Sequence, residues 1–490
     1  MDDAWNPNPD RAAATLLGDA LRAVKYTTDA IEELLGEDGP SADLAESVLF
    51  ERRLPSSKIA TTVQLLLLQR PTPTDAVTHA LGGDSVDALL TLGFVTEEGG
   101  ELVPRARIVP SEGIYLAFDG FSHGENDPPG WVASFSPTAY WLACLTPRRR
   151  VGRALDLGTG NGAHALLAAR HSEHVIATDV NERALGFTDI GAALNRITNV
   201  ETRLGSLFEP VEGETFDLIT CNAPYVVSPE SRWEYRDGGM QGDELSERVV
   251  RDAPRHLAPG GHASVLVSWV AEHEDEPDER VLDWLDGNGC DAWILGLSGA
   301  DPLDHAAGWN EHFSGDTDQM GEALDDWSSY FERLDVGWIT EGAVLMRRRD
   351  ADHHLVRVDP VEEEELEFAS DQIERVFTAL RLTAERGAAV VEELRLRLAE
   401  EVRFRQELDR RGELQDVVVL LDEGTCAEEE LEPGTAQVLT TLDGQTTLEK
   451  AVERTARRLD LDRRELAHLR ADTLKTVREL FELGFFEVVG

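Results

Sequence analysis

The feature that most constrains this chain of 490 residues is the stretch Ala-Leu-Asp-Leu-Gly-Thr-Gly-Asn-Gly at 154–162. An apolar strand followed by glycines at every second position predicts a tight strand-to-helix turn that a ligand can approach closely. Asp156 precedes the glycines, and Asp179 ends the next predicted strand. A carboxylate at that strand end can accept hydrogen bonds from both hydroxyls of a ribose, whereas Asp156 beside the turn would repel a pyrophosphate. The pattern therefore favours a nucleoside ligand without a pyrophosphate.

Predicted strands and helices alternate along residues 111–350. This order predicts an α/β fold, a doubly wound and mostly parallel Rossmann-like sheet of seven strands with helices on both faces. Such sheets bind ligands beyond the carboxyl ends of their strands, where the strand order reverses. Residues 298–333 are expected to form a loop-rich acidic insertion before the last strand. The expected strands are 154–157, 175–178, 200–203, 216–221, 262–268, 292–297 and 336–347.

Two further regions flank this domain. Residues 1–110 predict a mainly helical domain, in which a helix over 74–92, a Leu-Gly-Phe break and a short hairpin resemble a winged helix. Residues 351–490 predict a second helical, winged-helix-like domain, with a long helix over 373–408. Winged helices bind nucleic acid or serve as docking modules. The acidity of the first region favours docking.

The net charge is −48, from 94 Asp+Glu against 46 Lys+Arg. Binding of nucleic acid through bulk electrostatics is excluded, because phosphate contacts need clusters of Lys and Arg. Anionic membranes would repel the chain as well. The acidity fits a salt-rich cytoplasm, and the dominance of arginine fits a GC-rich genome. Because the acidity is spread over all three regions, only the charge around the site can indicate the partner.

The N-terminal residues lack the basic and apolar stretches of a signal peptide, and no run approaches 18 apolar residues. The four cysteines lie far apart without a CxxC pair, which argues against disulfides and a cysteine zinc site. His353 and His354 have no third ligand nearby in sequence. We therefore expect a protein of the reducing cytoplasm with no membrane segment and no metal.

Three motifs in order resemble those of the class I S-adenosylmethionine-dependent methyltransferases. The first is the glycine stretch at 154–162, the second Ala-Thr-Asp-Val-Asn at 177–181, and the third Phe-Asp-Leu-Ile-Thr-Cys-Asn-Ala-Pro-Tyr at 216–225. The third looks like the Asn-Pro-Pro-Tyr (NPPY) motif of N-methyltransferases. Within that class the chain is similar to the small methyltransferase or HemK type, which includes enzymes that methylate a glutamine amide in translation release factors. The segment 235–248 also resembles that family after its NPPY motif.

The resemblance implies S-adenosylmethionine as the methyl donor and assigns it a set of residues. Asp179 would take the ribose, and Ser206 stands where the family has an acid near the adenine. Thr138 lies in the segment that closes over the donor in the family. The implied donor-binding residues are Thr138, Asp156, Gly158, Thr159, Gly160, Asn161, Gly162, Asp179, Val180, Asn181, Ser206, Leu207 and Asn222.

The resemblance also implies how the acceptor nitrogen is held. An amide or exocyclic amine is a poor nucleophile because its lone pair is conjugated. The side-chain oxygen of Asn222 and the main-chain carbonyl of Ala223 would accept hydrogen bonds from its NH₂ group in line with the methyl. Pro224 would fix the turn and Tyr225 would stack on the planar acceptor. Ala223 replaces the family's first proline, which keeps the carbonyl but makes the turn less rigid.

Several other polar and aromatic residues carry weaker signals. His164, His171 and His174 are expected to be helix and surface residues, since their spacing is not that of a metal site. Trp233 and Trp309 are expected in loops beside the acceptor, as substrate contacts or as lid packing.

Three hypotheses remain open from the sequence. The first is an enzyme that methylates a glutamine amide of a protein partner. The second is an enzyme that methylates an exocyclic amine of an RNA or DNA base. The third, motivated by Ala223 and Ser206, is a donor-binding or docking protein that has lost activity. We favour the first.

Overall fold

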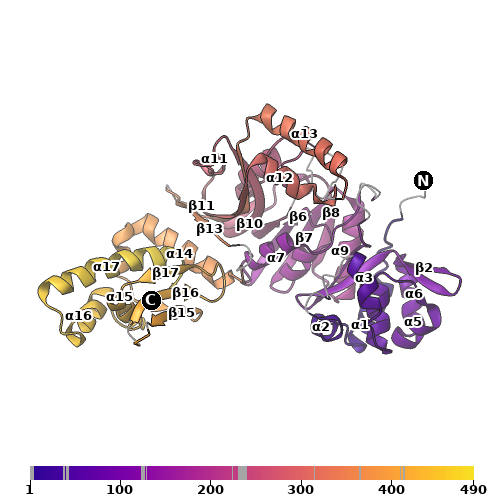
Figure 1. Ribbon diagram of the computed structural model, residues 1–490, viewed down its shortest axis with the longest axis horizontal. Coiled ribbons are helices and arrows are strands. Elements are labelled where there is room, and N and C mark those ends of the chain that lie inside the picture. The colour runs from indigo at the N-terminus through magenta and orange to yellow at the C-terminus, as the bar shows by residue number, and fades with distance from the viewer. Residues whose placement is uncertain are drawn as a thin grey trace.

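The structure is a computed structural model (Figure 1). It describes residues 5–36, 39, 44–122, 127, 130–222, 224–229, 240–313, 315–351, 353–362, 366–408, 410–411 and 414–489.

An eight-stranded sheet forms the centre of the chain and confirms the expected α/β fold. Its strands, in sheet order, are β13 (Val356–Pro360), β11 (Cys290–Ala300), β12 (Trp338–Arg348), β10 (Leu257–Ala271), β9 (Phe216–Cys221), β6 (Val151–Leu157), β7 (Ser172–Asp179) and β8 (Val200–Leu204). The run from β10 to β8 is parallel, and β12 is antiparallel to both of its neighbours. Seven of the strands are those expected. β13 adds an eighth from beyond residue 350.

Helices cover both faces of this sheet, because adjacent residues of its strands enter different hydrophobic clusters. Leu155 and Ile176 pack with α10 and α11, whereas Ala154 and Val175 pack with α8. The chain passes from β6 through β7 to β8 on one side and returns to β9 on the other, so the strand order reverses between β6 and β9. The helices are α7 (Pro137–Cys144), α8 (Ala163–Ala168), α9 (Glu182–Leu194), α10 (Glu244–Asp252) and α11 (Glu279–Leu285), with short 3₁₀ turns at Glu209–Val211 and Ala253–His256.

The expected loop-rich insertion is wrong, because most of its described residues are helical. α12 (Pro302–Trp309) and α13 (Thr317–Leu334) are capped by Asp301 and Asp316, and a 3₁₀ turn at Glu311–Phe313 lies between them. The apolar residues Trp327, Tyr330 and Phe331 recur at helical spacing and are buried. In the sequence, exposed acidic residues surround these apolar residues, so the helical period is hard to recognise.

The N-terminal region holds α1 to α6 and two small sheets. Its elements are α1 (Arg11–Ala23), α2 (Thr28–Leu35), α3 (Leu44–Glu51), α4 (Lys58–Leu66), β1 (Thr72–Pro73), α5 (Thr74–Leu81), α6 (Gly83–Leu92), β2 (Val95–Glu98), β3 (Glu101–Pro104), β4 (Ala106–Ser111) and β5 (Ile114–Asp119). The expected helix over 74–92 is two helices, α5 and α6, since Gly82 at φ 92° separates them. The sheet order is β1-β3-β2. The winged-helix-like interpretation stays a prediction.

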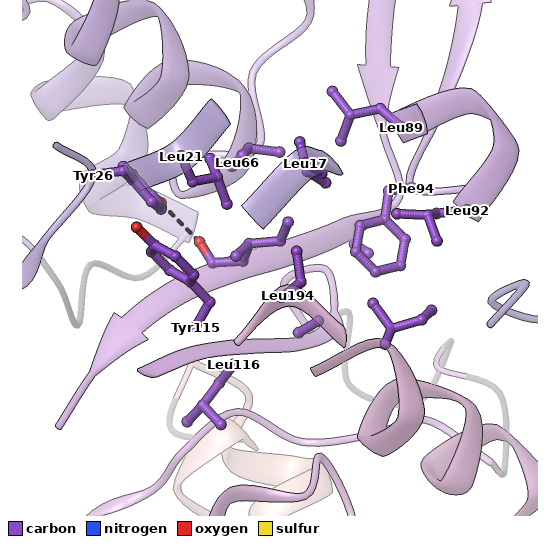
Figure 2. Packing of buried hydrophobic residues seen from close by; sticks show 14 of the residues in the cluster. Leu17, Leu21, Tyr26, Leu66, Leu89, Leu92, Phe94, Tyr115, Leu116 and Leu194 are labelled. Carbon is purple, nitrogen blue, oxygen red and sulfur yellow. Dashed lines mark hydrogen bonds between the residues drawn. The ribbon is translucent and has the colours of Figure 1, made fainter. Parts of the chain in front are cut away.

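This region packs directly on the central domain through one shared core (Figure 2). Leu17 and Leu21 of α1 lie in the same cluster as Leu194 of α9. The helices approach so closely that a Cβ at Gly18 would lie 2.1 Å from the carbonyl oxygen of Leu194. A buried ion pair between Arg183 and Asp119 ties α9 to β5. The two regions therefore share a packed interface.

The C-terminal region lies at the opposite end of the molecule (Figure 1). Its elements are α14 (Ser370–Arg386), a 3₁₀ turn at Ala388–Glu392, β14 (Leu396–Leu398), β15 (Val402–Leu408), β16 (Leu414–Leu421), β17 (Glu428–Leu431), α15 (Pro433–Leu439), α16 (Leu448–Arg458), α17 (Arg463–Glu482) and β18 (Phe486–Val488). The long helix expected over 373–408 is wrong. The observed helix, α14, ends before Gly387, which has φ 79°. Residues 402–408 form the strand β15, which begins with alternating half-buried and exposed residues.

Candidate functional site

The glycine-rich turn lies between β6 and α8, as the sequence predicts. Gly158, Gly160 and Gly162 have φ angles of 70°, 54° and 84°, in the left-handed region that favours glycine. Two of the three line the main cavity of the described structure, and Gly162 packs behind it against Thr188. The turn therefore presents main chain to the cavity where the sequence expects a ligand.

Gly162 should tolerate alanine less well than Gly160. Both positions have positive φ, so each substitution costs about 1 kcal/mol in the backbone. Only at Gly162 would the new Cβ also collide, 2.8 Å from the Thr188 hydroxyl oxygen, whereas nothing lies within 4 Å at Gly160. We expect Gly162→Ala to lose about 1–3 kcal/mol more stability than Gly160→Ala in denaturant unfolding. Equal losses would contradict the packing described.

Asp156 stabilises this turn through hydrogen bonds and does not line the cavity. Its carboxylate is buried and accepts hydrogen bonds from the hydroxyls of Thr159 (2.6 Å) and Thr220 (2.7 Å) and from the backbone N–H of Ala165 (3.1 Å). Those bonds connect β6, β9, the turn and α8. In this geometry Asp156 positions the turn, and its assignment to the donor site stays a prediction.

Asp179 ends β7 and does line the cavity. One carboxylate oxygen accepts from the backbone N–H of Gly160 (2.9 Å), and the other accepts from that of Asn181 (2.9 Å). The side chain is thereby fixed between the glycine turn and the start of α9, at the carboxyl end of a strand next to β6.

The acceptor motif follows β9 on the other side of β6. Asn222, Pro224 and Tyr225 all line the same cavity as Asp179. Tyr225 also packs against a hydrophobic cluster from α7 and the sheet. Ala223 and Trp233 lie outside the described residues. The three motifs, which together run from residue 154 to 225 in sequence, thus meet at the carboxyl ends of three adjacent parallel strands, β9, β6 and β7.

The cavity has a volume of about 640 Å³. Among the residues the sequence assigns to the site, thirteen line it: Thr138, Gly158, Thr159, Gly160, Asn161, Asp179, Val180, Asn181, Ser206, Leu207, Asn222, Pro224 and Tyr225. Asp156 and Gly162 support the turn without lining it.

Two of these residues donate hydrogen bonds from their side-chain amides to main-chain carbonyls of the protein. The Asn161 amide nitrogen donates to the carbonyl of Ala133 (3.0 Å), and that of Asn181 donates to the carbonyl of Gly130 (3.1 Å). Asp119 accepts from the backbone N–H of Val132 (2.8 Å). Asn161 and Asn181 therefore hold the segment 130–133 in place as a wall of the cavity.

That wall is the largest part of the site the sequence reasoning missed. Residues 131–134 and 136–139 line the cavity, but only Thr138 was assigned to it. Their sequence carries no motif; the clue would have been their place directly before the first helix of the domain.

His164 departs from its expected surface position. It is on α8 as expected, but it is 7% exposed and lines the cavity. Burial lowers the pKa of its imidazole, an effect that the nearby Asp156 opposes. Of the other two histidines, His171 is half-buried beyond the end of α8, and His174 is on β7 beside Glu201.

Trp309 is at the end of α12, not in a loop, and lines the same cavity. Its indole N–H donates to Glu341 on β12 (3.1 Å). Four residues earlier, a ring nitrogen of His305 lies 3.3 Å from the carbonyl oxygen of Val227, two residues after Tyr225. Burial lowers the pKa of His305 to about 4, so the neutral ring donates to that carbonyl at neutral pH. The insertion thus contributes Trp309 to the cavity wall and contacts the chain just after Tyr225.

No group of three His, Cys, Asp or Glu side chains within the described ranges is placed to hold a metal ion. No helix in those ranges is long and apolar enough to cross a membrane.

Comparison with known proteins identifies the central region. Residues 136–275 match the model of the family described as Methyltransferase small domain, and residues 23–106 match one described as Domain of unknown function (DUF7059). The first match confirms the resemblance of the central region to class I S-adenosylmethionine-dependent methyltransferases.

Individual relatives match the same region. The chain is 34% identical over 165 residues to a ribosomal protein uL3 glutamine methyltransferase from Bradyrhizobium diazoefficiens, a match covering 31% of this chain and 52% of that protein. It is 40% identical over 121 residues to a release factor glutamine methyltransferase from Cereibacter sphaeroides, covering 22% and 43%. The structure of Trm5b from Pyrococcus abyssi aligns with a TM-score of 0.32 at 16% identity, covering 52% and 62%. The chain spans about half the length of the two sequence relatives.

Proposed function

We propose that this chain is an S-adenosylmethionine-dependent N-methyltransferase that methylates the side-chain amide of a glutamine in a protein. The observation that carries the proposal is that Asn222, Pro224 and Tyr225 line the same cavity as Asp179 and the glycine turn. One cavity therefore offers a site for a nucleoside beside a site for a planar nitrogen. The relatives named above are glutamine methyltransferases of ribosomal protein uL3 and of release factors, which supports this class of acceptor.

The residues present fit the donor. The Asp179 carboxylate lines the cavity at the end of β7, where it would take the ribose hydroxyls, and the main chain of the glycine turn allows close approach. Val180 and Leu207 add apolar lining, and Val180 is 56% exposed. The donor, when bound, supplies a methyl group on a sulfonium, which transfers by in-line displacement.

The chain's own contribution to the reaction is positioning. The Asn222 side-chain oxygen accepts a hydrogen bond from the acceptor NH₂ and turns its nitrogen toward the methyl group. Tyr225 stacks on the amide plane, and Pro224 fixes the turn that presents both groups. Ala223 would supply the second acceptor through its main-chain carbonyl. Such an arrangement needs no strong general base, since the nitrogen can lose its proton after transfer.

The lining of the cavity favours a protein acceptor over a nucleic acid. Among the described residues that line it there is no lysine and no arginine, so none of them offers the cationic contact that a nucleic-acid phosphate needs. The nine Asp and Glu side chains of the insertion at 298–333 are all exposed, and its one arginine is Arg333. We infer that the flanking regions dock the acceptor protein in the cytoplasm.

The proposal is tested by labelling. The purified chain is incubated with methyl-labelled donor and, in separate reactions, with the release factors, ribosomal protein uL3 and total RNA of the same cell. We expect the label in a protein, and mass spectrometry should place one added methyl on a glutamine side chain. Label confined to RNA would overturn the assignment, as would binding of the donor with no labelled product in any pool.

A further inference from the structure

A second cavity, of about 220 Å³, lies between α7, α8 and β9. The polar side chains that line it are those of Thr146, Arg148, His164, Arg170, His171 and Thr220. No carboxylate is among the described residues lining it, although the whole chain holds twice as many acidic as basic residues. Every ionisable group at the cavity wall is therefore an arginine or a histidine.

The two arginines have no anionic partner within the described residues. Neither guanidinium makes an ion pair or a guanidinium hydrogen bond there, and the central carbon of the Arg148 guanidinium lies 3.8 Å from the centroid of the Phe368 ring. Burial lowers the pKa of Arg148, and the like charge of Arg170 lowers it further, while Glu112, outside the cavity, opposes both. Two exposed cations thus lie near each other at the cavity wall, and no carboxylate of the described residues forms an ion pair with either.

The inner end of the cavity holds a buried polar group that also lacks a partner. His164 is 7% exposed, and its Nε2 atom is buried without a hydrogen bond. The Nδ1–H of His171 donates to the carbonyl of Arg149 (3.0 Å), so Nε2 of the neutral ring is an acceptor and His164 is the imidazole with an unpartnered buried nitrogen. Because an unpartnered buried polar group costs folding free energy, an arrangement of this kind is expected where a ligand completes the hydrogen bonding.

We propose that this cavity is a binding site for a phosphate group. Guanidinium groups match a tetrahedral oxyanion with paired N–H donors, and the imidazole of His164 can supply one further donor. The hydroxyls of Thr146 and Thr220 already donate their hydrogens, to the carbonyl of Leu142 and to Asp156, and line the cavity as oxygen atoms. The volume holds one phosphate with a few waters but excludes a nucleic-acid chain. The ligand is therefore inorganic phosphate or a small phosphate ester.

The phosphate site is separate from the donor cavity, but the two share one lining residue and are connected by hydrogen bonds. His164 lines both cavities, and Thr220, at the wall of the second, donates to Asp156, which in turn holds the glycine turn. The two ligands occupy different spaces, so phosphate and the donor product S-adenosylhomocysteine bind without competing.

Calorimetric titration of the full chain with inorganic phosphate tests the site. The buffer contains 0.5 M KCl, about ten times the salt concentration at which attraction to surface charges is strong, so that such attraction is screened. The variants are Arg148→Gln and Arg170→Gln, both exposed positions, with Arg150→Gln as the matched control, since Arg150 is an exposed neighbour that does not line the cavity. We expect one phosphate per chain, at least about tenfold weaker binding in each of the two variants, and no change in the control.

Three results would overturn the proposal: no saturable binding of phosphate, equal weakening in Arg150→Gln, or displacement of phosphate by S-adenosylhomocysteine, which would put the anion in the donor cavity. A parallel titration with glycerol 3-phosphate identifies the source. Binding as tight as that of inorganic phosphate supports an esterified ligand, and weaker binding supports the free anion.

Discussion

Replacing Asp179 with alanine is expected to weaken binding of S-adenosylhomocysteine by about 10- to 100-fold. The substitution removes the carboxylate proposed to accept from two ribose hydroxyls, and hydrogen bonds to a charged group contribute about 1.5–3 kcal/mol. It also leaves the N–H groups of Gly160 and Asn181 without their acceptor, so the turn and the start of α9 lose a shared anchor. Calorimetry with the product, which needs no acceptor protein, measures the effect.

A matched control variant distinguishes this loss of affinity from the effect of removing any carboxylate from the domain. Asp189, on α9, accepts from the Thr202 hydroxyl and does not line the cavity. Asp189→Ala should leave the affinity for S-adenosylhomocysteine within about twofold, and Asp179→Asn, which keeps one oxygen acceptor, should fall between the two. If Asp179→Ala binds the product as tightly as the unchanged protein, the donor has been placed in the wrong part of the cavity.

The sequence located these anchors because each depends on a local rule. A glycine that needs positive φ and an acid at a strand end are visible as single residues, and parallel strands bring their carboxyl ends together whatever lies between them. Hence Gly160, Asp179 and Asn222 were predicted to lie together, and they line one cavity.

What the sequence could not provide is the direction in which a side chain is used. Asp156 and Asp179 look alike in their motifs, yet the first turns toward Thr220 of a neighbouring strand and the second toward the cavity. Asn161 and Asn181 line the cavity but donate to backbone carbonyls of the segment 130–133, a choice set by a segment remote in sequence. Such pairings depend on tertiary packing, which no local pattern specifies.

The same limit explains the errors of secondary structure. In Val402–Leu408 apolar residues alternate with polar ones, a period that fits a strand, but long runs of helix-forming Glu, Arg and Leu precede it and favour a helix. Pairing with β16 decides for the strand, because Val402 to Gln406 align with Val417 to Leu421. The partner strand supplies hydrogen bonds that propensity does not count.

Asn222→Ala is expected to lower kcat/KM for the acceptor protein by at least about 10²- to 10³-fold while leaving the affinity for S-adenosylhomocysteine within about threefold. The side-chain oxygen acts on the acceptor nitrogen, so its removal costs transition-state stabilisation on the scale seen for the loss of a single polar contact at a reacting group. The donor keeps Asp179 and the glycine turn, which the substitution does not touch.

Asn199→Ala is the control that makes this result specific. Asn199 donates through its side-chain amide to the carbonyls of Ala169 (3.0 Å) and Ser172 (2.9 Å), so its loss destabilises the same domain without touching the cavity. We expect a lower midpoint of unfolding but unchanged turnover per folded molecule. If Asn222→Ala instead retains turnover, the acceptor nitrogen is held by other groups and the proposed chemistry is wrong. If it loses donor binding and turnover together, Asn222 belongs to the donor half of the cavity. Only turnover lost with donor binding kept places the acceptor nitrogen beside β9.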